Sequence, residues 1–312
     1  MRLIFSRKGV DSASGGTTSP IFPDQTMFSL PIPDKQSPIR YEDIAWNNRN
    51  VGALVSELTR GRILATYRAH LDPDLVESSV PRDPQWKPIF GQTSASQSHL
   101  RNAGVAEGDL FLFYGLFREV LEQEGRVRWV TKSAARHVLW GWLQIGDIVH
   151  IDECEAGTLS WARYHPHFHR GTESNNTLYI SRTHLELPGI ALPDLPGAGV
   201  FSLFSPSLQL SAQGSALASI WSLPPWFYPS EGRTPLTYHG DLDRWSRTES
   251  VTTLRSVGRG QEFVLDCNEY PEATAWCHIL LGSSGRGPRG EALPNAIGAQ
   301  HPSERIPRQQ CN

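Results

Sequence analysis

Three histidines alternate along one polar run in the middle of the chain. His165, His167 and His169 occupy every second position of YHPHFHR. Alternate side chains of a β-strand share one face, and neutral imidazoles on one face can hold zinc or iron. Pro166 disfavours a central strand, so contact of these histidines and Arg170 with a base or a phosphate is preferred over a metal site. A surface loop is the third interpretation.

A second group of charged residues follows an apolar run at the N-terminus, in the motif SRKGxD. It comprises Ser6, Arg7, Lys8 and Asp11. Cationic side chains and backbone N–H groups at the end of a strand can hold a phosphate or a ribose. The motif therefore predicts a ligand-binding strand end, with a solvated charged turn as the alternative.

A carboxylate late in the chain could act as an acid or a base. Glu262 opens an apolar strand directly after the turn RGQ, where a glutamate can orient a ribose hydroxyl or serve as general base. Gln261 would point to the opposite face of that strand. An early Arg7, a mid-chain Tyr179 and a late Glu262 are loosely similar to the site of ADP-ribosyltransferases. That resemblance implies that the arginine holds NAD, the tyrosine stacks on nicotinamide and the glutamate stabilises an oxocarbenium ion.

Aromatic residues accompany a histidine and an acid further along. Trp226 and Tyr228 stand in the run WFYP, and His239 and Asp241 in YHGD. Aromatic rings beside hydrogen-bonding groups can stack a flipped base and read its edge. An aromatic mini-core bounded by prolines is the alternative.

The apolar pattern predicts the elements that must position these residues. Strands are expected at residues 2–6, 108–118, 128–130, 140–151 and 262–266, with a Gly-Asp turn at Gly146 dividing the fourth. Helices are expected within 39–60, 96–104 and 271–281, and a loop or linker rich in proline and glycine at 185–200. Gln92, Gln97 and His99 precede the second strand and could line a polar pocket or form a solvated helix face.

This order of elements predicts an α+β fold, a single domain over residues 1–281 with a mixed, mostly antiparallel sheet and a few packing helices. Residues 282–312 are expected to be a disordered tail rich in Gly, Pro, Arg and Gln. Paired Gly-Asp strand starts also occur in small barrels such as PUA-like readers of modified bases, an analogy of fold alone.

Composition sets limits on the class of protein. The 312 residues are 39% hydrophobic and 10% aromatic with ten Trp, enough for a sizeable core. No apolar run approaches the roughly 20 residues of a membrane span, so a cytoplasmic protein without a membrane partner is expected. The four cysteines form no CxxC pair and are expected to be free thiols. The net charge of −3 argues against a broad nucleic-acid-coating surface but not against a local basic pocket, and the motifs of common hydrolases, NTPases, zincins and deaminases are missing.

Nine blocks of sequence occur in the order found in one known family. They resemble the nucleotide-modification-associated domain family of the third type, over about residues 1–281. The resemblance implies a part in the modification of DNA bases in phages and bacteria. The blocks are SRKGxD, SPIFPD, HLDPD, GDLFLF, WLQIG, NTLYI, WFYP, YHGD and RGQEFV.

Together these features predict an enzyme that acts on a nucleotide or on a DNA base. The alternatives are an NAD-dependent enzyme similar to ADP-ribosyltransferases and a non-catalytic reader of modified bases. The cofactor and the oligomeric state are left open by the sequence. The candidate catalytic residues are Glu262, Arg7, Asp11 and His239. The candidate substrate-binding residues are Lys8, Ser6, Asp24, His165, His167, Asn176, Tyr179, Trp226, Tyr228 and Gln261.

Overall fold

A large mixed sheet forms the centre of the molecule. The structure, a computed structural model of the 312-residue chain, describes residues 1–155, 157–171, 173–230, 232–258 and 262–282. In this part of the chain nine strands form one sheet, whose main path runs β18-β1-β8-β10-β11-β7. They are β1 (Arg2–Arg7), β2 (Ser19–Ile21), β7 (Ile89–Gln92), β8 (Leu110–Gln123), β9 (Arg126–Trp129), β10 (Arg136–His150), β11 (Thr177–Ser181), β14 (Ala198–Val200) and β18 (Glu262–Asp266).

The expected α+β class is confirmed. β8 runs parallel to β1 and β2, and the other pairings of the sheet are antiparallel. The sheet follows an open path of strands rather than a closed barrel. The run from Leu110 to Phe113 is buried on both faces, which explains why it reads as a continuous apolar stretch rather than as an alternating one.

Two local predictions about strands are wrong. Gly146 does not divide two strands: β10 continues through it, and the pairing with β11 shifts register there as in a β-bulge. A Cβ at Gly146 would lie 2.8 Å from the backbone nitrogen of Arg182, so the glycine permits close approach of these two backbone segments. Residues 185–200 are not a linker but contain β12 (His184–Leu187), β13 (Ile190–Pro196) and β14. Prolines are tolerated there because β12 and β13 form a separate two-stranded sheet with open edges.

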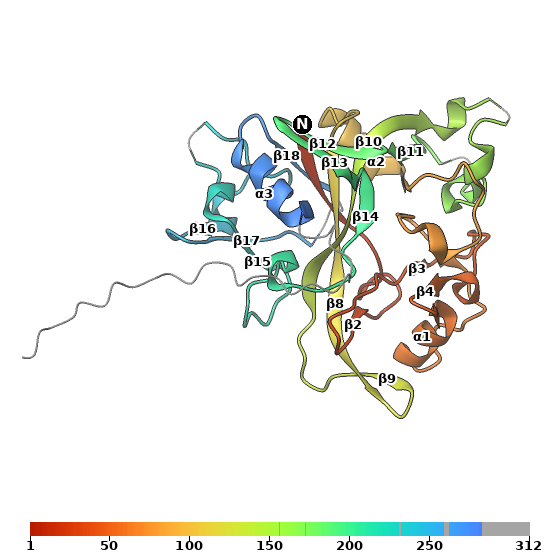
Figure 1. The fold of residues 1–312 in the computed structure, drawn as a ribbon. Helices are drawn as coiled ribbons and strands as arrows, with labels where there is room; N and C mark the ends of the chain where they lie inside the picture. Colours follow the sequence, from red (N-terminus) through yellow and green to blue (C-terminus); the bar gives the residue numbers. More distant parts are fainter. Residues whose placement is uncertain (156, 172, 231, 259–261, 283–312) are drawn as a thin grey trace, which may run out of the picture.

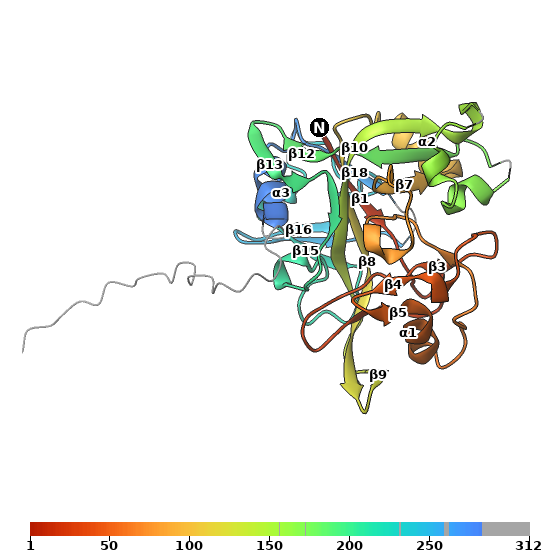
Figure 2. The same ribbon diagram turned by 45° about the vertical axis from the view of Figure 1, so that its right-hand side comes forward.

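The helices cover the two sides of the sheet. Figures 1 and 2 both place α3 (Glu272–Gly282) with the small sheet of β15, β16 and β17 on one side of the central strands, and α1 (Val51–Leu58) with β3 and β4 on the other. All three expected helical regions contain a helix. The remaining helix, α2 (Ser94–Asn102), ends just before Gly104, whose φ of +68° is the left-handed conformation that commonly follows the end of a helix. The disordered tail was expected over residues 282–312: Gly282 is instead the last residue of α3, and residues 283–312 lie outside the described residues.

The remaining elements are short. The small strands are β3 (Ile32–Pro33) paired with β6 (Ala69–His70), β4 (Ala45–Trp46) paired with β5 (Arg49–Asn50), and the sheet of β15 (Ile220–Leu223), β17 (Thr252–Arg255) and β16 (Trp245–Arg247). The 3-10 helices are η1 (Tyr41–Asp43), η2 (Glu77–Ser79), η3 (Ile151–Glu153), η4 (Ser160–Ala162), η5 (Pro166–His169), η6 (Pro206–Leu208), η7 (Pro225–Phe227) and η8 (Leu242–Arg244).

Candidate functional site

A polar cavity of about 330 Å³ lies where four segments of the chain meet. These are the end of β1 with the turn after it, the end of β6 with the residues that follow, the junction of β7 with α2, and η5 with the residues that follow; Ile32 of β3 adds one further contact. Its lining includes three cations, Arg7, Lys8 and Arg170. The amino end of α2 also reaches the cavity through Thr93 and Ser94. Their N–H groups already donate to Oε1 of Gln92 and to the carbonyl oxygen of Ser174, so the helix start would favour an anion through its dipole rather than through these N–H groups.

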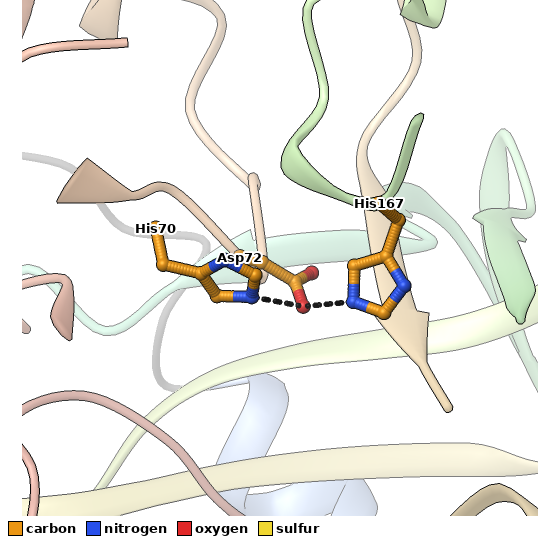
Figure 3. A group of neighbouring side chains, drawn as sticks. All are labelled: His70, Asp72 and His167. Carbon is orange, nitrogen blue, oxygen red and sulfur yellow. Dashed lines mark ion pairs between the residues drawn. The ribbon is translucent and has the colours of Figure 1, made fainter. Parts of the chain in front are cut away.

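A buried carboxylate, Asp72, lies at one wall of this cavity. Its Oδ2 is 3.5 Å from Nε2 of His70 and 3.4 Å from Nε2 of His167 (Figure 3). Its Oδ1 accepts a hydrogen bond of 2.8 Å from the backbone N–H of Gly91 and lies 3.3 Å from Nε2 of His165. Burial raises the pKa of Asp72, but the hydrogen bonds from the three histidines outweigh it and hold that pKa well below its ordinary value.

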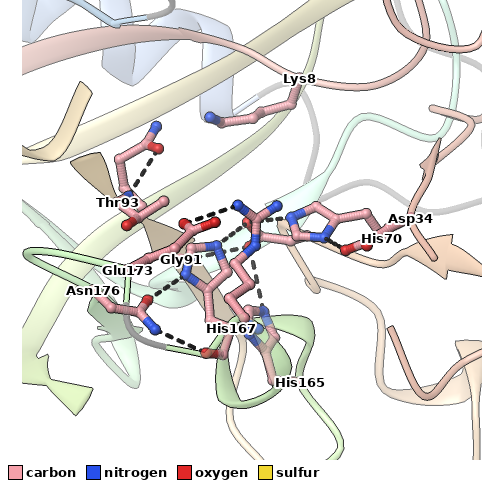
Figure 4. Close-up of polar contacts among 12 residues, drawn as sticks. Lys8, Asp34, His70, Gly91, Thr93, His165, His167, Glu173 and Asn176 are labelled. Carbon is pink, nitrogen blue, oxygen red and sulfur yellow. Dashed lines mark hydrogen bonds and ion pairs between the residues drawn. The ribbon is translucent and has the colours of Figure 1, made fainter. Parts of the chain in front are cut away.

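Each of two histidines is oriented by a partner on its other ring nitrogen (Figure 4). Nδ1 of His70 lies 2.8 Å from Oδ2 of Asp34, and Nδ1 of His167 lies 2.6 Å from Oδ1 of Asn176. Burial lowers the pKa of His70, but the contacts with the carboxylates of Asp34 and Asp72 outweigh burial and raise it. The hydrogen bond from His70 in turn lowers the pKa of Asp34 to about 2. Burial lowers the pKa of His165.

Position 91 must be glycine for this arrangement to form. The ring of His167 lies directly over Gly91 on β7, and a Cβ at this position would be 2.6 Å from Nε2 of His167.

A second buried cluster holds the neighbouring segments of the chain in place. Asp74 accepts hydrogen bonds from Arg82 Nη2 at 2.6 Å and from Tyr164 Oη at 2.7 Å. Asp74 thereby ties the segment after β6 to the segment that leads into η5.

The opposite wall carries a buried ion pair. Nζ of Lys8 lies 3.0 Å from Oε1 of Glu262, which also accepts a hydrogen bond of 2.5 Å from Nε2 of Gln92. The Glu262 side chain is only 1% exposed and lies behind Lys8 and Gln92, which do line the cavity. Ser6 pairs with Glu262 across β1 and β18, and its buried hydroxyl has no hydrogen-bond partner among the described residues.

The structure brings a large part of the predicted site together. Arg7, Lys8 and Asp11 line the cavity with His167, while Asn176 and His165 hold the residues of its wall. Arg7 and Asp11 lie 3.9 Å apart as an ion pair. Glu262 and Ser6 stand behind the cavity on neighbouring strands. The roles of these residues in catalysis and binding stay predictions.

Other predicted residues lie elsewhere. Asp24 is exposed and accepts a hydrogen bond from Thr26 in its own turn. His239 is fully buried, with Nδ1 2.8 Å from the carbonyl oxygen of Thr237 and Nε2 accepting from the N–H of Val257 at 3.2 Å. Burial lowers the pKa of His239 to about 4. Both ring nitrogens of His239 therefore serve the fold.

The aromatic run is likewise part of the packing. Trp226 stacks on Phe227 with ring centroids 3.9 Å apart and meets Trp276 of α3 edge-on. Tyr228 is partly buried against the same core. None of these lines the polar cavity. Gln261 lies outside the described residues.

The strand face of three histidines, on which the less favoured metal interpretation depended, does not form. Residues 166–169 form the 3-10 helix η5, in which every third residue aligns, so His165, His167 and His169 do not share a face. His165 and His167 turn inward to Asp72, whereas His169 is exposed and contacts the carbonyl oxygen of Arg163. Among the described residues, the group whose spacing would allow it to hold a metal ion is His70, Asp72 and His167, with potential ligand atoms within 4.8 Å of one another.

The similarity to ADP-ribosyltransferases finds only part of its geometry. Arg7 and Glu262 lie on the neighbouring strands β1 and β18. Tyr179, however, is 1% exposed, donates a hydrogen bond of 2.8 Å to Oε1 of Gln97, and packs on the rings of Phe90 and Phe111. Its ring face is occupied by these core residues rather than presented to the cavity.

Two residues at the centre of the site carry no role predicted from the sequence. His70 and Asp72 appeared only within the block HLDPD. The signal that could have found them is their spacing, since residues two apart in an extended segment face the same side. Asp34 had no comparable signal, because its part depends on the pairing of β3 with β6.

Comparison with known families places the chain. The family model described as nucleotide modification associated domain 3 matches residues 2–266. The protein therefore belongs to the nucleotide modification associated domain 3 family, as the nine blocks suggested. The search of the curated proteins and that of the solved structures find no match. Among the described residues, no helix is both long enough and apolar enough to cross a membrane.

Proposed function

We propose that this protein is an enzyme of nucleotide or DNA base modification and that its substrate binds in the polar cavity. The observation that carries the proposal is the gathering of Arg7, Lys8 and Arg170 with the amino end of α2 around one space of about 330 Å³. Bidentate guanidinium groups and a helix start are complementary to phosphate. The family membership supports a substrate of nucleotide chemistry.

A second cavity supports a base beside that phosphate. It measures about 150 Å³ and shares the residues Gly9, His70 and Asp72 with the polar cavity. Its wall includes Phe28, Trp46, Trp140 and Phe201. Flat aromatic and apolar surfaces of this kind accept a nucleobase removed from its stack. We assign the sugar and phosphate to the polar cavity and the base to the apolar one.

The roles of the charged residues follow from their positions. Arg7 and Arg170 would contact phosphate oxygens, and the His70–Asp72–His167 group stands where the two cavities adjoin. Asp72 is held there as a carboxylate and could accept a hydrogen bond from a substrate group. Glu262, the acid or base expected from the sequence, would act through Lys8 and Gln92, because its Oε1 holds both of these cavity-lining side chains in place.

Calorimetric titration of the full chain tests the proposal. The ligands are the four deoxynucleoside monophosphates, NAD and a short single-stranded oligodeoxynucleotide. Arg7→Gln is expected to weaken the binding of a monophosphate at least about tenfold, since charge-assisted bonds to phosphate contribute roughly 1.5–3 kcal/mol each. Arg126→Gln, at an exposed position of β9, is the matched control and should bind as the natural chain does.

The outcomes distinguish the proposed function from its two alternatives. Failure of all these ligands to bind would refute the proposed function. Consumption of NAD would favour the enzyme similar to ADP-ribosyltransferases. Binding of DNA that depends on a modified base, with no change in the nucleosides recovered afterwards by mass spectrometry, would favour a reader.

A further inference from the structure

The hydrogen bonds around His70 fix which of its nitrogens carries a proton. Nδ1 lies 2.8 Å from Oδ2 of Asp34. An ionised carboxylate only accepts hydrogen bonds, so Nδ1 is the donor. In the neutral ring the lone pair is then on Nε2, the nitrogen that faces Asp72.

His167 is fixed in the same way by an amide. Nδ2 of Asn176 donates to the backbone carbonyl of His167 at 2.8 Å, which identifies Oδ1 as the amide atom that faces the imidazole. Nδ1 of His167, 2.6 Å from that oxygen, is therefore the donor. The lone pair of His167 is again on Nε2, and it too faces Asp72.

Asp72 completes an asymmetric arrangement. Its Oδ1 receives the N–H of Gly91 at 2.8 Å and faces His165. Its Oδ2 faces only the two Nε2 atoms, at 3.5 and 3.4 Å (Figure 3). When both rings are neutral, three lone pairs converge on one point, all within 4.8 Å of one another and all on residues that line the polar cavity. Without an ion the carboxylate of Asp72 attracts protons to the facing Nε2 atoms, and a bound ion would displace them. Such a set is stabilised by a cation at its centre.

We propose that Nε2 of His70, Oδ2 of Asp72 and Nε2 of His167 bind one divalent transition-metal ion of the zinc or iron(II) type. Ligand atoms about 2.1 Å from a tetrahedral ion lie about 3.4 Å apart, close to the two separations observed from Oδ2. Two imidazoles and one carboxylate suit these ions, whereas magnesium prefers oxygen ligands throughout. With three protein ligands, the ion keeps an open position toward the cavity, as catalytic metal sites do.

The surroundings of the three ligands match a metal site rather than a chance cluster. Asp34 and Asn176 occupy the outer positions that hold ligating histidines in the required tautomer and ring orientation. Gly91 leaves room for the His167 ring and supplies the N–H that turns Oδ1 of Asp72 away from the ion. This inference does not depend on the proposed function, because it concerns the affinity for an ion alone.

Titration with zinc chloride of the full chain, first dialysed against a chelator, tests the inference. One Zn²⁺ per chain is expected, with no competition from a large excess of Mg²⁺. Asp72→Asn and His167→Gln should each weaken Zn²⁺ binding at least about 100-fold. Asn176→Ala, which keeps all three ligands, should weaken it about 10–100-fold. The matched control is His169→Gln, an exposed histidine of the same 3-10 helix, which should bind zinc unchanged.

Folding and coordination are followed by separate readouts. Far-ultraviolet circular dichroism checks that each variant keeps the native fold. Cobalt(II) substitution should give the visible absorption of a four- or five-coordinate ion with nitrogen and oxygen ligands. Absence of stoichiometric zinc binding by the folded natural chain would overturn the inference, as would unchanged affinity in folded Asp72→Asn or equal loss in His169→Gln. Failure of nucleotide binding would leave it standing.

Discussion

Removal of the ammonium group of Lys8 should destabilise the fold through Glu262. The side chains of Lys8 and Glu262 are 11% and 1% exposed, and their charged atoms are 3.0 Å apart. Breaking a buried ion pair by removing one partner costs about 3–5 kcal/mol, because the remaining charge stays buried without compensation. Gln92 still donates to Oε1 of Glu262 in the Lys8→Met variant, so the lower end, about 3 kcal/mol, is expected.

The double variant makes this reasoning specific. Glu262→Gln removes the negative charge and keeps the shape of the side chain, while Lys8 retains access to the cavity. We expect that single variant to lose about 1 kcal/mol and Lys8→Met/Glu262→Gln to lose about 1 kcal/mol as well. The double variant would then be about 2 kcal/mol more stable than Lys8→Met alone.

Urea unfolding followed by tryptophan fluorescence measures these differences. A loss of about 3 kcal/mol corresponds to a fall in Tm of about 5 °C for a folded chain of this size. Lys35→Met, at an exposed lysine, is the control and should stay within about 0.5 kcal/mol of the natural chain. Additive losses from the two single substitutions would refute the argument, since they would mean that the two charges do not compensate each other.

Three further outcomes are expected. The pKa of His239 is lowered to about 4 in the folded protein, against 6.5 in the unfolded chain, so its contribution to stability is complete above pH 6.5 and is lost as the pH falls toward 4. Urea unfolding should show a loss of about 2 kcal/mol from this residue between pH 7 and pH 5, and His239→Gln should remove that loss. Gly91→Ala should displace the ring of His167, cost about 1–3 kcal/mol in urea unfolding, and weaken zinc binding in calorimetry. Arg82→Met leaves the fully buried Asp74, whose pKa burial already raises, without its guanidinium partner, and should lower the free energy of unfolding by about 3 kcal/mol.

Each of these predictions has a control at an open position. His184→Gln, at an exposed histidine of β12, should leave the pH dependence unchanged. Gly240→Ala meets no atom within 4 Å and should be nearly neutral. Arg40→Met breaks only an exposed ion pair with Glu42 and should cost less than about 1 kcal/mol. Equal effects of control and test substitutions would show that burial and contact do not set these energies.

The sequence by itself determined the elements whose apolar pattern is local. The runs that became β1 and β8 are continuous and apolar because both strands lie in the middle of a covered sheet, and that of β18 is apolar because this edge strand is buried as well. The glycine at position 104 likewise marks the end of the helix before it. The order of nine blocks also indicated the family, because a short motif can be recognised from neighbouring residues without knowing their contacts in the fold. The cations at the end of β1 were found for the same reason.

Only the tertiary structure decided which polar residues meet. His70 and Asp72 lie on one segment and His167 on another, and no local pattern indicates that the chain at the end of β6 lies against η5. The alternating histidines were assigned a common face by the two-residue period of a strand, but the 3-10 helix turned His169 to solvent. His239 and Trp226 were predicted as site residues from their chemistry, whereas the structure places them outside the lining of the polar cavity, His239 with both ring nitrogens in contact with backbone groups and Trp226 stacked on Phe227. Whether a polar or aromatic side chain lines the cavity or packs in the core depends on contacts between segments far apart in the sequence, and no local motif states those contacts.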